Sequence, residues 1–343
     1  RSGRPVVVIP EPIRIMGWSY DVERSMLEPR GIALIVPETE AEARAAMSDA
    51  DVIFTSSPIN ADDIATLRNC VGILCYSVGM DYVDAEAAKA RGIPVWNCPT
   101  SNNEEVSDHA VLLILAAQRR LLPFATAAKQ GNWDIYEWPL LSEIHQMRNR
   151  TIGIIGLGRI GHLIAQKLHG FRSTVIACDP FIEKTRDPDV ELVSLDELAA
   201  RADILVSAAA LTDTSRGIIN REFLAKTRPG VLIVNVSRGG IVVEEALREA
   251  LDSGHVAYAA LDVRSPEPPD PKHDLLTDHP KATLTQHIAA SSQESVAGLH
   301  IEAAEQIIRL LEQAGRLSNP VDFTQPAVAD TVRRRNRDAA RPV

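Results

Sequence analysis

Arg238, Glu267 and His287 are the residues of this sequence whose side-chain types best fit one piece of chemistry. Each lies in a polar segment that directly follows a strand-like apolar run. Parallel sheets place their ligand sites at the carboxyl ends of such strands, so the three side chains are expected to meet there. The segments are Asn235–Gly240, Ala260–Pro268 and Thr285–Ser291.

Taken singly, Arg238 fits a strand-end cap, Glu267 a solvated loop acid and His287 a structural histidine. Taken together, they fit the reduction of a keto acid, which needs a cation to hold the carboxylate and polarise the carbonyl, and an acid to protonate the carbonyl oxygen as a hydride arrives. Arginine offers a planar fork that matches a carboxylate, and histidine titrates near neutral pH. A hydrogen bond from the far imidazole nitrogen to Glu267 would favour protonated His287.

A glycine-rich motif, Gly156-Leu157-Gly158-Arg159-Ile160-Gly161, provides the second chemical signal. It follows the strand-like run Thr151–Ile155 and opens a helix-like stretch, His162–Leu168. The next strand-like run, Thr174–Cys178, ends at Asp179. This order of strand, glycine turn, helix and acid-tipped strand is typical of a dinucleotide site.

Each part of that motif has a physical purpose. Gly156 and Gly158 permit a tight turn and close approach of the backbone to a pyrophosphate, whereas Gly161 lets helix and strand pack closely. Amide groups at the helix start face the phosphate charge. Asp179 accepts ribose hydroxyls and repels a 2′-phosphate, so NAD is favoured over NADP. The alternative is a purely structural glycine turn.

The elements that must position these residues form two series. From residue 5 to about 97, β-rich runs alternate with helical stretches such as Glu40–Ser48 and Ala85–Arg91. This alternation predicts a parallel sheet with helices on both faces. The expected strands are Val6–Ile9, Ile32–Val36, Val52–Thr55, Gly72–Tyr76 and Pro94–Trp96.

A second series begins at residue 151, with helical stretches such as Leu195–Arg201 and Glu244–Ser253 between its strands. The whole chain is therefore expected to be an α/β protein with two doubly wound parallel sheets. The expected strands are Thr151–Ile155, Thr174–Cys178, Ile204–Ala208, Val231–Val236, Ala257–Val263 and Ala282–Leu284.

Two long helical stretches flank the second series. Asn103–Leu122, which ends before Pro123, is expected to be either a core helix or a dimer-forming helix that links the domains. Gln293–Gly315, followed by Leu317–Asp322, is too short for a third domain and is expected to pack back on the first.

Length and charge narrow the class of protein. A chain of 343 residues exceeds the roughly 100–200 residues of one domain, so two domains are expected. The formal net charge of -10 repels a polyanion, and the one dense basic patch lies in an apolar-poor tail. We expect a solvated tail and no nucleic-acid partner. The patch is Arg333, Arg334, Arg335 and Arg337.

Cysteine usage and hydropathy bear on location. The four cysteines form no C-x-x-C pair with metal spacing, so neither a metal site nor a disulfide is expected. No run approaches the ~18 apolar residues of a membrane helix, and no targeting segment is recognised. A cytoplasmic protein with reduced thiols is expected. The cysteines are Cys70, Cys75, Cys98 and Cys178.

On these motifs, the chain closely resembles the D-isomer-specific 2-hydroxyacid dehydrogenase family, over roughly residues 50–325. The resemblance implies that Arg238, Glu267 and His287 are a catalytic triad and that Asp262 holds the nicotinamide carboxamide. The implied NAD contacts are Gly156, Gly158, Arg159, Ile160 and Gly161 at the pyrophosphate, Asp179 at the adenosine ribose, Ala210 in a cofactor loop, and Val236, Ser237, Arg238, His287 and Ala290 near the nicotinamide.

The resemblance also implies a substrate and a domain plan. The loop Ser77-Val78-Gly79 would bind the substrate carboxylate through its backbone, with Arg238 and His287 completing the site for a small 2-keto or 2-hydroxy acid. Residues 1–101 plus 292–326 would form a discontinuous, flavodoxin-like substrate domain, and 102–291 a Rossmann NAD-binding domain. Residues 327–343 would be a disordered tail, and the interdomain helix would form a homodimer.

Three departures from the family pattern leave the substrate open. Gln286 stands where proline usually precedes the histidine, Arg264 replaces an aromatic residue after Asp-Val, and Ala208–Leu211 lacks the usual His and Pro. The residues expected to reshape the pocket mouth are Arg264, Met80, Trp133 and Trp138.

Two other functions fit the same motifs. One is an NAD-sensing scaffold like the corepressors of this family, and the other is a dehydrogenase of another small anion such as phosphite. The related formate dehydrogenases carry Gln at the position of Glu267, so this glutamate argues against formate.

Overall fold

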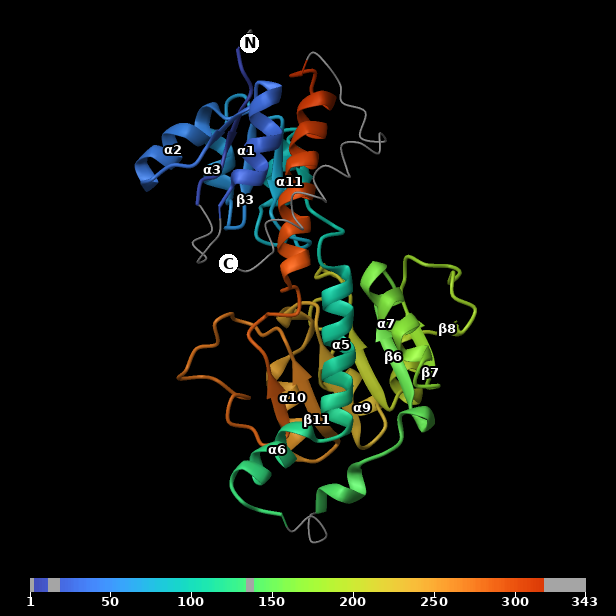
Figure 1. The fold of residues 1–343 in the computed structure, drawn as a ribbon. Helices are drawn as coiled ribbons and strands as arrows, with labels where there is room; N and C mark the ends of the chain where they lie inside the picture. Colours follow the sequence, from blue (N-terminus) through green and yellow to red (C-terminus); the bar gives the residue numbers. More distant parts are fainter. Residues whose placement is uncertain (1–2, 12–18, 134–138, 318–343) are drawn as a thin grey trace, which may run out of the picture. The chain divides into compact units, whose positions relative to one another are not determined.

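The computed structural model describes residues 3–11, 19–133 and 139–317 (Figure 1). The chain divides into two compact units, one made of Arg1–Asn102 with Ser291–Val343 and the other of Asn103–Ala290. The predicted junctions lie one residue from each of these. The predicted tail, 327–343, lies outside the described residues, as does all but the first residue of Leu317–Asp322.

Unit 1 contains a five-stranded sheet in which every strand pair is parallel. The strands are β1 (Val6–Val8), β2 (Ala33–Ile35), β3 (Val52–Thr55), β4 (Gly72–Cys75) and β5 (Val95–Trp96). Their order, β2-β1-β3-β4-β5, is that of flavodoxin-like folds, as predicted.

Helices cover both faces of this sheet because its central strands are apolar on both sides. One face packs against α1 (Asp21–Leu27) and α11 (Gln293–Gln313). The other packs against α2 (Glu40–Asp49), α3 (Ala61–Thr66) and α4 (Ala85–Ala90). The long helical stretch after residue 292 therefore belongs to the first unit, as predicted.

Unit 2 contains a seven-stranded parallel sheet in the order β12-β11-β10-β9-β6-β7-β8. The order reverses between β6 and β9, so loops leaving these two strands diverge and open a ligand crevice, as in Rossmann folds. The strands are β6 (Thr151–Ile155), β7 (Thr174–Cys178), β8 (Val190–Leu192), β9 (Ile204–Ser207), β10 (Val231–Asn235), β11 (Val256–Leu261) and β12 (Ala282–Leu284).

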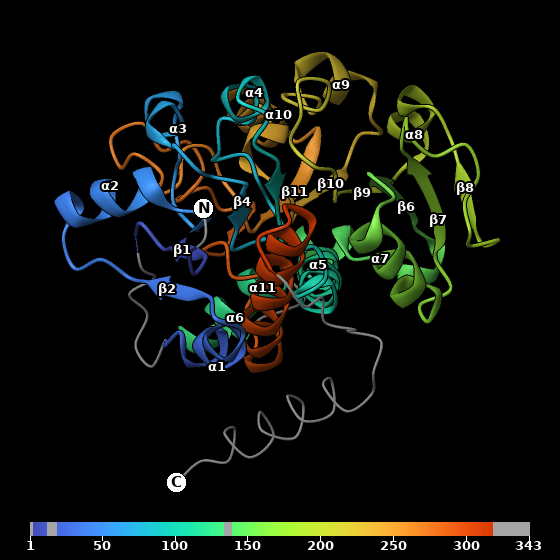
Figure 2. The ribbon, with the colours of Figure 1, turned by 90° about the horizontal axis from the view of Figure 1, so that it is seen from above.

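The sheet of unit 2 is also covered on both faces, as Figure 2 shows from above. Helices α5 (Asn103–Gln118) and α7 (Arg159–His169) bury their apolar residues on one face. On the other face lie α8 (Leu195–Arg201), α9 (Arg221–Lys226) and α10 (Glu244–Asp252).

The predicted helix Asn103–Leu122 is corrected by the structure. It ends at Gln118, and a second helix, α6 (Leu121–Lys129), starts after Arg120 adopts a left-handed conformation with φ of 49°. Pro123 fits inside the first turn of α6, where a missing N–H costs no helical hydrogen bond. No single helix among the described residues is long and apolar enough to cross a membrane; only α5 and α6 together pass that test, across a 65° bend.

Four further elements were not predicted from the sequence: α1, α3, β8 and α9. They hold between three and seven residues, too few to show a clear hydrophobic period. Capping residues were the available signal for two of them. Asn60 and Asp63 form a capping box at α3, and the Asn220 side chain accepts a hydrogen bond from Phe223 N at the start of α9.

Candidate active site

The three glycines of the loop between β6 and α7 occupy three different environments. Gly156 has a φ of 89°, and a Cβ there would lie 2.6 Å from Ala209 Cα. A Cβ on Gly161 would lie 2.2 Å from Gly156 O, so this glycine sets the packing of the helix on the loop. At Gly158 a Cβ would meet nothing within 4 Å. The exposed Gly158 is therefore where a ligand can approach the backbone.

Asp179, at the carboxyl end of β7, binds that glycine loop directly. One carboxylate oxygen accepts a hydrogen bond from Leu157 N at 2.8 Å, and the other accepts one from Phe181 N at 2.9 Å. The carboxylate is only half-buried. Each oxygen keeps a lone pair that can accept a ribose hydroxyl. A dinucleotide therefore fits the residues present.

The loops after β9 and β10 lie on the other side of the sheet's reversal. Ala210 O accepts a hydrogen bond from Ser215 Oγ at 2.7 Å, which closes the loop after β9. Ser207 and Ser237 are buried, and their hydroxyls are 2.8 Å apart. The Ser207–Ser237 contact joins the end of β9 to the loop after β10.

His287 and Glu267 are in direct contact. His287 Nδ1 and Glu267 Oε2 lie 2.7 Å apart, with both side chains partly open to solvent. The hydrogen bond to Glu267 raises the pKa of His287 against the opposing effect of burial. Burial acts to raise the pKa of Glu267, but hydrogen bonds from His287 and the Arg264 N–H leave it lowered. The pair therefore favours an imidazolium beside a carboxylate.

Arg238 joins this pair from the loop after β10. Its main chain is held by Asn235, whose Nδ2 donates to Arg238 O at 2.9 Å, and its Nη1 donates to Ser237 O at 2.8 Å. The guanidinium charge contributes to lowering the pKa of both Glu267 and His287. The structure thus brings together the three residues singled out from the sequence.

Asp262 organises the loop that carries His287. Its side chain is fully buried, and its carboxylate accepts hydrogen bonds from Thr285 Oγ1 at 2.5 Å, Ile288 N at 3.0 Å and Ala289 N at 2.9 Å. These bonds support the left-handed conformation of His287, with φ of 53°. In the structure, Asp262 holds the loop 285–289. Its contact with a nicotinamide stays a prediction.

His109, on α5, is a supporting residue that sequence reasoning missed. Its Nε2 lies 3.2 Å from Thr285 Oγ1 and 3.5 Å from Asp262 Oδ1. The available signal was a histidine among the largely apolar residues of that helix.

A pocket of about 820 Å³ opens beside the His287–Glu267 pair within unit 2. Its walls combine these polar side chains with apolar ones from α6, the loop after β11 and β12. Lining residues include Leu122, Pro268, Pro269, Leu284 and Gln286.

The predicted substrate loop lies in unit 1, directly after β4. Ser77 Oγ donates to Gly79 O at 2.7 Å and lies 2.9 Å from the Tyr82 hydroxyl. Asn97 Nδ2 donates to Val78 O at 2.6 Å. These bonds give the loop a defined shape, and its role with substrate stays a prediction.

The residues that were expected to reshape the pocket mouth differ in their position and exposure. Arg264 lines the pocket beside the His287–Glu267 pair, as expected, and its guanidinium is held there in ion pairs with Glu244 and Asp274. Met80 and Trp133 are exposed, at 41% and 75% respectively. Gln286 is exposed next to His287, and Trp138 lies outside the described residues.

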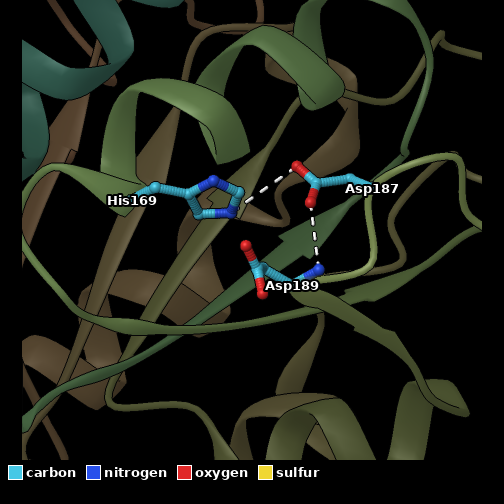
Figure 3. A group of neighbouring side chains, drawn as sticks. All are labelled: His169, Asp187 and Asp189. Carbon is cyan, nitrogen blue, oxygen red and sulfur yellow. Dashed lines mark hydrogen bonds and ion pairs between the residues drawn. The ribbon is translucent and has the colours of Figure 1, made fainter.

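One group of potential metal ligands occurs among the described residues, at the carboxyl end of α7 (Figure 3). His169, Asp187 and Asp189 bring one ligand atom each to within 4.8 Å of one another. His169 Nε2 lies 3.5 Å from Asp187 Oδ2, and Asp189 N donates to Asp187 Oδ1. The hydrogen bond within the Asp187–Asp189 turn, beside the last residue of α7, accounts for the close approach of the two aspartates.

Comparison with known proteins gives the same picture. Residues 111–289 match the model of the D-isomer specific 2-hydroxyacid dehydrogenase, NAD binding domain. The chain is 36% identical over 267 residues to D-3-phosphoglycerate dehydrogenase of Mycobacterium bovis, covering 76% of this chain and 48% of that one. It thus spans about half the length of that relative.

Two other relatives extend over nearly their whole length. Hydroxypyruvate reductase of Thermotoga maritima is 34% identical over 292 residues, covering 85% of this chain and 91% of that one. The crystal structure of the TT0316 protein from Thermus thermophilus is 31% identical, with a TM-score of 0.76, covering 93% of this chain and 100% of that one. The chain belongs to the D-isomer specific 2-hydroxyacid dehydrogenase family.

Proposed function

We propose that this protein is an NAD-dependent dehydrogenase that interconverts a small 2-keto acid and the D-isomer of its 2-hydroxy acid. The observation that carries the proposal is the 2.7 Å contact between His287 and Glu267 at the carboxyl end of a Rossmann sheet, near enough to Arg238 for its charge to act on both. Bound NADH supplies the hydride.

The three side chains have complementary tasks in this reaction. Arg238 binds the substrate carboxylate and draws electron density from the carbonyl oxygen. His287 donates a proton from Nε2 to that oxygen in reduction and accepts it back in oxidation. Glu267 holds the Nδ1 proton and stabilises the imidazolium, which is why it acts through His287 rather than on the substrate.

The pH dependence follows from the raised pKa of His287. Reduction needs the protonated imidazole, so it is fully supported below that pKa and is lost as the pH rises through it. Oxidation needs the neutral imidazole and has the opposite dependence. Glu267 thus extends keto-acid reduction towards neutral and higher pH.

The cofactor-binding residues are proposed from the fit of the glycine loop. Gly156, Gly158 and Gly161 with Arg159 and Ile160 would hold the pyrophosphate, and Asp179 the adenosine ribose. Residues of the loops after β9, β10 and β12 would line the remainder: Ala210, Val236, Ser237, Arg238, Asp262, His287 and Ala290. In unit 1, the loop Ser77-Val78-Gly79 is proposed to bind the substrate carboxylate through its backbone.

Turnover of a keto-acid panel tests this function. NADH is mixed with the protein and glyoxylate, pyruvate, hydroxypyruvate, oxaloacetate, 2-ketoglutarate or phenylpyruvate, and loss of NADH absorbance is followed. Enzyme-dependent loss with at least one acid supports the proposal. No loss with any of them, in a preparation that binds NADH, would contradict it and would redirect attention to NAD-dependent binding of a partner or to another anion.

Assembly and location are proposed on separate grounds. A homodimer is supported by four exposed apolar side chains on or near α5 and α6: Leu112, Leu121, Leu122 and Trp133. A cytoplasmic location is supported by four cysteines that are all free thiols. Cell fractionation tests the location. Recovery of the protein in the membrane fraction or in the medium would exclude a cytoplasmic location.

A further inference from the structure

Arg264 is the most deeply buried arginine of the catalytic loops, with 7% of its surface exposed. Its Nε and Nη2 each donate to one oxygen of Glu244 at 2.7 Å, and Nη2 also donates to Asp274 Oδ1 at 2.9 Å. Its remaining nitrogen, Nη1, is buried with no hydrogen-bond partner among the described residues. The cluster therefore buries three charges, one positive and two negative, next to the Glu267 loop.

Both acidic partners are themselves held by rigid elements. Glu244 is the first residue of α10, where a carboxylate is favoured by the helix N-terminus, and it also accepts from Ser265 N at 3.2 Å. Asp274 accepts hydrogen bonds from Leu276 N, Thr277 N and the Thr277 hydroxyl. The arginine thus connects the loop after β11 to the start of α10 and to the 274–277 turn.

Stability alone does not account for such a cluster. Replacing a buried ion pair with apolar side chains of similar volume is often neutral or stabilising, because removing charges from water is costly. The orphaned Nη1 adds a further cost of desolvation. What the cluster does provide is a fixed main-chain position at residue 264.

That main-chain position matters for the catalytic pair. Arg264 N donates to Glu267 Oε1 at 2.6 Å, while Glu267 Oε2 faces His287 Nδ1 at 2.7 Å. The peptide of Arg264 also packs on the Arg238 loop, since a Cβ on Gly239 would lie 1.8 Å from Arg264 O. The main chain of Arg264 therefore contacts two of the three catalytic loops, one through its N–H and the other through its C=O.

We propose that Arg264 is a positioning residue whose buried ion pairs with Glu244 and Asp274 fix its own N–H, so that this N–H presents the Glu267 carboxylate to His287. The inference deepens the proposed function, because the group it positions is the proposed acid and base. Arg264 itself touches neither substrate nor cofactor in this scheme.

The test is the pKa of His287, measured by NMR with selectively labelled histidine. The imidazole faces the charges of Glu267, Arg238 and Asp262, with His109 of α5 contacting Asp262. Glu267→Gln removes the partner carboxylate, so this variant gives the pKa that His287 has without a charged partner. Arg264→Met, which keeps the aliphatic stem of the side chain but not its charged end, should lower the pKa of His287 towards that value by about half a unit or more.

Two further variants complete the design. Arg264→Lys should give a His287 pKa between those of the wild type and Arg264→Met. If Arg264→Met does not fold, Arg264→Lys is measured in its place. Arg221→Met breaks the exposed pair between Arg221 of α9 and Glu249 of α10, the helix that also carries Glu244, and should leave the pKa of His287 unchanged. In activity, the alkaline limb of kcat/KM for reduction should move down by the same amount as the pKa.

Some outcomes would overturn the inference. A folded Arg264 variant whose His287 titrates as in the wild type, or an equal fall in Arg221→Met, excludes a positioning role. The titration needs no substrate, so it is read independently of turnover. The predicted pKa changes in a protein that reduces none of the keto acids would leave the positioning intact and reject the proposed reaction instead.

Discussion

At the scale of the residue, the site depends on hydrogen bonds that favour the charged forms of His287 and Glu267. His287, Glu267 and Arg238 are separated by 20 to 49 positions in the sequence, yet their charges act on one another in the structure. Asp262 and Asn235 touch no reacting atom in the proposed scheme, but they fix the loops that present His287 and Arg238. The predictions at this scale change single charges.

Arg238→Ala removes the cation that would bind and polarise the substrate. We expect kcat to fall by about 100- to 1000-fold, the usual loss when one electrostatic contact to the transition state is removed. NADH affinity, measured by fluorescence titration, should change little. Turnover like the wild type would exclude Arg238 from the triad.

Glu267→Gln keeps the size of the side chain and removes its charge. The pKa of His287 should fall, because the neighbouring carboxylate no longer favours the imidazolium. The pH above which keto-acid reduction is lost should therefore move down, as measured by a kcat/KM profile. An unchanged alkaline limb would show that another group provides the proton.

Asp179→Asn keeps one acceptor oxygen for Leu157 N, replaces the oxygen that accepts from Phe181 N with an NH2 group, and removes the charge that would repel a 2′-phosphate. The ratio of kcat/KM for NADH over NADPH should fall by about tenfold, equivalent to ~1.4 kcal/mol. Thermal unfolding serves as the control for the loop. If the ratio stays as in the wild type, the ribose is recognised by a different residue.

At the scale of the element, the turn between β6 and α7 shows how similar residues differ in purpose. Gly161 is required by packing, since a Cβ would lie 2.2 Å from a backbone oxygen. Gly158 faces open space and has φ of -71°, which any residue adopts. Gly161 is therefore needed for packing within the fold, and Gly158 leaves room for a ligand.

Gly158→Ala and Gly161→Ala form a matched pair. Gly158→Ala should unfold at the same temperature as the wild type but bind NADH at least about tenfold more weakly, because the methyl group occupies the approach to the backbone. Gly161→Ala should lower the free energy of unfolding by about 1–3 kcal/mol, as overpacking does. Calorimetry and NADH titration separate the two effects, and identical behaviour of both variants would contradict this division.

At the scale of the whole molecule, the proposed dimer predicts a dependence on the exposed apolar side chains of α5 and α6. A Leu112→Glu, Leu121→Glu double variant should shift the protein to a monomer in light scattering after gel filtration. Ile35→Glu, at an exposed apolar position in unit 1, is the matched control and should leave the mass unchanged. A wild-type protein that is already monomeric would exclude the dimer.

The sequence by itself determined the two parallel sheets, the glycine loop and the identity of the three polar residues. Strand-helix alternation and buried apolar runs are local signals, and so is a glycine motif followed by an acid-tipped strand. Longer elements such as α7 and α11 were recognised for this reason. Short elements such as α1 and β8 were not, because three to seven residues carry little periodicity.

Only the tertiary structure decided the break at Arg120 and the environment of Arg264. Arg120 lies 4.9 Å from the Tyr258 ring centre and contacts Glu143, so partners far along the chain accompany the left-handed turn. Arg264 lines the pocket, as expected, but its buried ion pairs with Glu244 and Asp274 were not predicted. Burial and charge pairing depend on residues brought together by folding, and local sequence patterns do not contain that information.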